Sequence, residues 1–185
     1  MKDKIENYTV SDFINKGYGL EYDCVLKHLK PRNKFASKEA NIDALKYNEV
    51  RVLIKLVNEI DSWDDVCELF CLAFQIEKYD FLNETIQNFY GARNFLFKEI
   101  EKIVSRENKL LNDRSVDSEL WQNADNGRLK PFSDILPLIT LGEKFRIYPF
   151  DLGSKPYGEI LSLLLAIKKY NEVERDFYEI KKGMQ

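Results

Sequence analysis

Four side chains in this 185-residue chain have the types and the spacing for metal chemistry. Cys24 and His28 are four residues apart, and Cys67 and Cys71 repeat that spacing. Residues four apart share one face of a helix. Two such pairs facing one another would form a Cys3His tetrahedron, which suits zinc. A zinc-binding protein that uses Cys24, His28, Cys67 and Cys71 is therefore one interpretation of the sequence.

The surroundings of the two pairs favour structural roles instead. Cys67 and Cys71 lie in an apolar run around Phe70, where a free cysteine packs as a small hydrophobic side chain. His28 follows Lys27 near the expected end of a helix, where positive charge interacts favourably with the helix dipole. Structural zinc ligands usually lie closer together, on short loops. We therefore predict no metal ligand and no cofactor.

Catalytic chemistry is not expected either. His28 is the only histidine, so any serine or cysteine nucleophile would depend on it as a base. The pair Gly17 and Gly19 lacks the third glycine and the preceding strand of a phosphate-binding loop. Asp64 and Asp65 are consecutive, which places their carboxylates apart on a helix. We predict a protein that is not an enzyme and has no catalytic residue.

Charge and hydropathy exclude two further classes of partner. The chain has 28 Lys and Arg against 31 Asp and Glu, a net charge of -3, whereas nucleic-acid binders normally carry a basic patch. Residues 138–164 have the outline of a helix-turn-helix, but Tyr157 and Glu159 stand where a recognition helix needs basic or amide side chains. The apolar run 160–167 is far shorter than the roughly 20 residues that span a bilayer. We expect no nucleic acid and no membrane.

Localisation is inferred from the N-terminus and the cysteines. The first residues are charged and have no apolar stretch of signal-peptide length. Three cysteines, an odd and small number, favour a reducing compartment. We therefore expect a cytoplasmic protein.

Apolar spacing predicts an all-α fold, a helical bundle with one long helix and a C-terminal helix-turn-helix-like unit. Ser62 with Asp65 matches a capping box, and Thr9 or Ser11 can cap a first helix that Gly17 ends. A polar connector is expected at 32–43 and a tight connector at 147–154, and no strand is expected. The predicted helices cover residues 9–16, 20–30, 45–60, 62–74, 81–111, 132–146 and 154–180.

The helix predicted at 81–111 has an apolar stripe at alternating spacings of four and three, which Arg93 and Glu107 interrupt. Gly91 lies inside it and permits a kink or a close contact. A helix of this length packs on several neighbours or on another subunit, so a homo-oligomer is one possibility.

A polar stretch at 112–130 is the expected boundary, although Trp121 indicates a short helix within it. Four of the five prolines follow residue 130. We expect a helical body at 1–112 and a C-terminal helical unit at 113–185, packed as one globular domain.

Two segments share a Tyr-x-Glu-(Val/Ile) pattern, one within 46–53 and one within 155–163. They are either an internal repeat or two helix starts with similar chemistry, because a Glu in the first turn suits the dipole. Trp63, Trp121, Tyr148 and Tyr157 are either core residues or anchors at a protein interface.

The C-terminal motifs resemble those of small helical proteins of tailed bacteriophages, namely tail-assembly chaperones and minor virion proteins. The resemblance covers residues 120–180 best, and the N-terminal pattern is similar more loosely. It carries over no catalytic or ligand residue. The motifs are Trp121-Gln-x-Ala124, Leu129-Lys-Pro-Phe132, Leu141-Gly-Glu-Lys-Phe145, Pro149-Phe-Asp-Leu152 and Pro156-Tyr-Gly-Glu-Ile160.

This resemblance implies a non-enzymatic bacteriophage structural or assembly protein that acts through contacts with other phage structural proteins. It would then reside in the virion or in the host cytoplasm. A cytosolic helical adaptor or regulator of a host or phage partner is the alternative, beside the zinc-binding protein considered above.

Overall fold

The computed structural model describes residues 8–17, 28–111, 124–125 and 127–184, and it divides the chain into two compact units. The first unit comprises Met1–Leu45 and Glu49–Val104. The second comprises Lys46–Asn48 and Ser105–Gln185. The domain boundary expected after residue 112 falls on residues 112–123, outside the described part.

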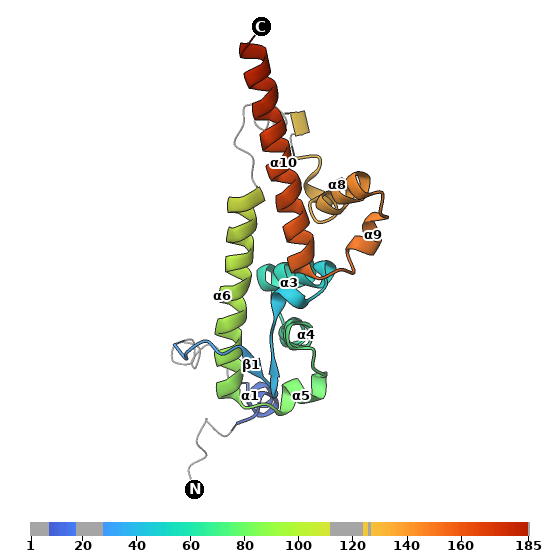
Figure 1. The fold of residues 1–185 in the computed structure, drawn as a ribbon. Coiled ribbons are helices and arrows are strands. Elements are labelled where there is room, and N and C mark those ends of the chain that lie inside the picture. The colour runs from blue at the N-terminus through green and yellow to red at the C-terminus, as the bar shows by residue number, and fades with distance from the viewer. Residues whose placement is uncertain (1–7, 18–27, 112–123, 126, 185) are drawn as a thin grey trace. The chain divides into compact units, whose positions relative to one another are not determined.

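The all-α class is confirmed, because the described ranges contain eight α-helices and one hairpin of two-residue strands (Figure 1). The first unit holds α1 (Val10–Asn15), β1 (Lys34–Phe35), β2 (Lys38–Glu39), the 3-10 turn η2 (Ile42–Ala44), α4 (Trp63–Phe74) and α5 (Lys78–Asn83). The second holds η3 (Lys130–Phe132), α8 (Leu136–Phe145), α9 (Pro149–Leu152) and α10 (Tyr157–Gly183). Residues of both units belong to α3 (Tyr47–Glu59) and α6 (Ile86–Leu111).

Two of the predicted helix starts are confirmed by their caps. The Thr9 hydroxyl accepts the backbone N–H of Asp12, and the Asp12 carboxylate accepts the N–H of Thr9. Ser62 and Asp65 make the same reciprocal pair at the start of α4. Each capping box satisfies N–H groups that have no partner within the helix.

An aromatic cluster fills the core of the first unit. The Phe70 ring centroid lies 4.8 Å from that of Phe35, 5.0 Å from Phe89 and 5.4 Å from Phe81. All four rings are buried, and edge-to-face contacts such as that between Phe35 and Phe70 suit the quadrupoles of aromatic rings. The segment expected to be a polar connector therefore contains the hairpin β1–β2, in which Lys34 pairs with Glu39. Phe35 anchors this hairpin in the core.

The long helix predicted at 81–111 is α6, but it begins at Ile86, and the predicted first turn belongs to the separate helix α5. Tertiary hydrogen bonds break the helix at Glu84. The Val10 N–H donates to the Glu84 carbonyl at 2.9 Å, and the Ala36 N–H donates to the Glu84 carboxylate at 2.9 Å. These bonds hold Glu84 extended, which ends α5.

Gly91 makes the close contact that its place in the long helix suggested. A Cβ there would lie 3.3 Å from the Lys30 carbonyl oxygen, and the Arg32 N–H donates to the Gly91 carbonyl at 2.9 Å. The helix runs unbroken through this position.

Other predicted segments also differ from the structure. The connector at 147–154 contains the short helix α9. The helix expected at 20–30 lies mostly outside the described residues, and its last three positions are turn, bend and coil. Helix α10 starts at Tyr157 with Pro156 as its N-cap, and it extends past the predicted end to Gly183.

The two Tyr-x-Glu segments pair with one another in the second unit. The Tyr47 N–H donates to the Lys155 carbonyl at 2.9 Å, and Lys46 and Pro156 form an isolated antiparallel bridge. The Tyr47 and Tyr157 rings are buried and stacked, with centroids 6.3 Å apart. The shared pattern therefore marks two helix starts that pack together.

A different repetition is visible in the backbone. The succession of a helix, a short helix and a long helix occurs twice, as α4, α5 and α6 and again as α8, α9 and α10. Gln75 after α4 and Arg146 after α8 are both left-handed, with φ of 53° and 56°. The N–H groups of these two residues donate to the carbonyls of Cys71 and Gly142, respectively.

The starts of the following long helices repeat as well. Thr85 precedes α6 and forms an antiparallel bridge with Thr9, as Pro156 before α10 does with Lys46. The two segments thus share the order of a helix, a left-handed residue, a short helix, a bridged residue and a long helix.

Candidate functional site

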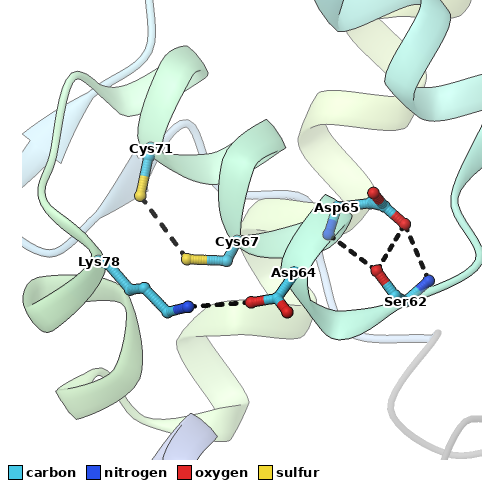
Figure 2. Close-up of polar contacts among 6 residues, drawn as sticks. All are labelled: Ser62, Asp64, Asp65, Cys67, Cys71 and Lys78. Atoms are coloured by element: carbon cyan, nitrogen blue, oxygen red, sulfur yellow. Dashed lines mark hydrogen bonds and ion pairs between the residues drawn. The ribbon is translucent and has the colours of Figure 1, made fainter.

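Cys67 and Cys71 lie on one face of α4, with their sulfur atoms 3.8 Å apart (Figure 2). Beside them, Lys78 Nζ donates to the Asp64 carboxylate at 2.9 Å. The predicted helical pairing of these cysteines is therefore present within the first unit.

Burial makes both thiols poor nucleophiles. It raises the pKa of Cys67, and it raises that of Cys71 to about 12, with the neighbouring Cys67 adding to the shift. A thiol with so high a pKa remains protonated at neutral pH, and it is the thiolate that acts as the nucleophile. The pair therefore acts as apolar packing.

The other two residues of the zinc hypothesis do not complete a site in the described part of the chain. His28 is exposed, and Cys24 lies outside the described residues. Among the described residues, no group of three or more His, Cys, Asp or Glu side chains is arranged to hold a metal ion.

The four candidate interface anchors have different surroundings. Tyr157 is fully buried, and Trp63 is half-buried in the first unit. Tyr148 is exposed. Trp121 lies outside the described residues. Of the three that can be placed, Tyr148 alone has the exposure that an anchor needs before a partner binds.

An open pocket of about 490 Å³ lies in the first unit. Its wall includes the rings of Trp63 and Tyr90, and its polar groups include Asp61 and Arg93. The Arg93 guanidinium lies over the rings of Tyr90 and Phe97, at 5.6 and 5.0 Å from their centroids. Arg93, which interrupts the apolar stripe of α6, is thus packed on aromatic faces.

The second unit exposes a run of large apolar side chains where α8 turns into α9. We call this the aromatic surface, and it consists of Phe145, Ile147, Tyr148 and Phe150, each between 44 and 63 % exposed. The rings of Tyr148 and Phe150 lie 5.4 Å apart. Exposed aromatic side chains such as these are natural anchors at protein interaction sites.

The backbone under the aromatic surface is closely packed. A Cβ on Gly142 would lie 2.7 Å from the Ile147 carbonyl oxygen and 3.0 Å from Pro149, so only glycine lets the connector approach α8. The Ile147 N–H donates to the Gly142 carbonyl at 3.1 Å, and left-handed Arg146 reverses the chain. These contacts fix the positions from which the exposed rings project.

A second exposed apolar face lies on the C-terminal half of α10, the red helix of Figure 1. We call this face the α10 seam. It was missed as a site in the sequence, although its spacing of three and four was visible there. It consists of Tyr170, Val173, Phe177, Ile180 and Met184.

No helix within the described ranges is long and apolar enough to cross a membrane. No protein-family model, curated protein or solved structure matches the chain.

Proposed function

We propose that the protein is a non-enzymatic structural or assembly protein of a tailed bacteriophage that acts through protein–protein contacts. It would serve as a minor virion component or as a tail-assembly chaperone. The observation that carries this proposal is the aromatic surface, because four large apolar side chains are exposed there on a closely packed backbone.

The location of this surface links it to the phage-like motifs. Leu141–Phe145 and Pro149–Leu152, two of the motifs that resemble phage proteins, contribute Phe145 and Phe150 to it. Tyr148 stands between them. Tyr and Phe are enriched at protein interfaces because they bury much apolar area with few rotatable bonds.

The chemistry of the described side chains also suits a binding role better than a reaction. The two placed cysteines are protonated packing residues, since burial raises the pKa of each. The net charge of -3 provides no basic field for a nucleic acid. Because the C-terminal motifs resemble those of phage proteins, we expect the partners to be other phage structural proteins.

Mass spectrometry of purified phage particles tests this proposal. Detection in stoichiometric amounts with the tail proteins supports the virion component. Absence from particles, together with co-purification with tail proteins from infected cells, supports the chaperone. Absence from both, with capture of a non-structural partner, overturns the proposal in favour of a cytosolic adaptor or regulator.

A further inference from the structure

The α10 seam follows the spacing of a coiled coil. Its five residues recur after three, four, three and four positions, which are the a and d positions of two heptads. Each of the five side chains is between 58 and 81 % exposed. The stripe extends upstream through Ala166 and half-buried Leu163, which completes three heptads.

We propose that the α10 seam binds the same seam of a second copy of this chain, as a parallel, in-register two-stranded coiled coil. This proposal is independent of the phage assignment, since it rests only on α10. It leaves the aromatic surface available for other partners.

The charges beside the seam determine the orientation. Lys169 and Asp176 occupy g positions, and Glu174 and Lys181 occupy e positions. In a parallel, in-register pair, each g residue contacts the e residue five positions later on the other helix. Lys169 then meets Glu174 of the second copy, and Asp176 meets Lys181. Twofold symmetry doubles these contacts, so all four join opposite charges.

The side chains have the freedom to make these contacts. Lys169 bonds Glu172 of its own helix at 2.6 Å, but its side chain is 75 % exposed and on the solvent side of the helix. Lys169 can therefore exchange Glu172 for Glu174 of the second copy, or bind both, without disturbing the packing of the second unit.

Sedimentation equilibrium of the full chain tests the association. The wild type is expected at twice the 21.8 kDa monomer mass. Phe177→Asp, which places a charge in the seam, is expected to weaken dimerisation about 100-fold or more. Tyr178→Asp is the matched control, because Tyr178 is the next residue, is similarly exposed and lies off the seam. A monomeric wild type, or a control as disruptive as Phe177→Asp, would overturn the proposal.

A charge exchange tests the pairing. Lys169→Glu is expected to weaken the dimer about tenfold by placing Glu against Glu174 of the second copy. Adding Glu174→Lys in the same chain restores opposite charges and is expected to restore the wild-type affinity. A double variant no tighter than the single variant argues against the parallel register.

A cysteine cross-link tests the orientation directly. Val173→Cys lies at a d position, where the two copies face one another in a parallel pair. Mild oxidation should therefore join two chains at this position. Asn171→Cys, which lies off the seam, is the control and should not cross-link. No cross-link at 173, or equal cross-linking at 171, overturns the proposal, and circular dichroism verifies that each variant folds.

Discussion

The hydroxyl of Tyr157 donates a hydrogen bond of 2.8 Å to Oε1 of Glu107, within the second unit. Tyr157 begins α10, and Glu107 lies near the end of α6. The Arg106 guanidinium lies 5.6 Å from the Tyr157 ring centroid. Glu107, a polar interruption of the apolar stripe, thus serves to satisfy a buried hydroxyl.

Removing that hydroxyl should destabilise the protein. Tyr157→Phe is expected to lower the free energy of unfolding by about 1–2 kcal/mol at pH 7, because it deletes a hydrogen bond to a charged group. Tyr148→Phe, at an exposed position, should leave it unchanged. Urea denaturation followed by circular dichroism measures both. Equal stability of Tyr157→Phe and wild type would show that this bond contributes nothing.

The same variant has a second readout at alkaline pH. Burial, and then the Glu107 carboxylate, raise the pKa of Tyr157 above its ordinary value of 10.0. The contribution of the Tyr157 hydroxyl to the free energy of unfolding is therefore complete below about pH 10. It is lost above that pH, because Tyr157 then ionises in the unfolded chain but stays protonated in the folded one. Between pH 10 and 11 the wild type should lose up to about 1.4 kcal/mol per pH unit more than Tyr157→Phe. Parallel pH profiles would contradict the raised pKa.

The native cysteine pair should react slowly with alkylating reagents. Burial raises the pKa of Cys71 to about 12 and also raises that of Cys67, so few thiolates exist at pH 8. Iodoacetamide should label Cys71 at least roughly 100-fold more slowly than in urea-denatured protein and should also label Cys67 more slowly, with both rates rising as the pH rises. Peptide mass spectrometry over time gives the site-specific rates. Labelling of native Cys71 at the denatured rate would disprove this packing.

Gly142 should not tolerate a side chain. Gly142→Ala would bring a Cβ within 2.7 Å of the Ile147 carbonyl oxygen, and the expected cost is about 1–3 kcal/mol. Gly183→Ala is the matched control, since nothing lies within 4 Å of its Cβ and alanine favours the helix. The midpoint of thermal unfolding should therefore fall for Gly142→Ala and stay the same or rise for Gly183→Ala. A harmless Gly142→Ala would mean that the connector is not closely packed.

Replacing Arg146 by glycine should stabilise the protein. Its φ of 56° is left-handed, a conformation that L side chains adopt at a cost, so Arg146→Gly is expected to stabilise by roughly 0.5–1 kcal/mol. Glu143→Gly, inside the same helix, should instead destabilise by about 1 kcal/mol. Urea midpoints compare the two. Destabilisation by Arg146→Gly would indicate that its side chain contributes more than its backbone costs.

Local chemistry made part of the fold predictable from the sequence. The caps at Thr9 and Ser62 need only residues three positions apart, and apolar spacing placed the start of α10 within three residues of Tyr157, where the helix begins. The break before α6 was not predictable, because Glu84 is held extended by N–H groups of distant Val10 and Ala36. Hydrogen bonds between residues far apart in the sequence determined where α6 begins.

Exposure was the least predictable property of the candidate site. Tyr148 and Tyr157 are the same residue type, each near the start of a helix, yet the first is exposed and the second buried. Phe35 stands in a polar run but lies in the aromatic core. The periodicity of α10 was readable, but only the fold shows which apolar residues remain uncovered.

Affinity purification from infected cells tests the proposed role of the aromatic surface most directly. The tagged wild type is compared with the double variant Tyr148→Ser and Phe150→Ser, and with Tyr79→Ser as an exposed-aromatic control in the first unit. We predict that the wild type and the control retrieve phage structural proteins and that the double variant retrieves about tenfold less or none. Equal retrieval by the double variant, or no structural protein with the wild type, would contradict the account.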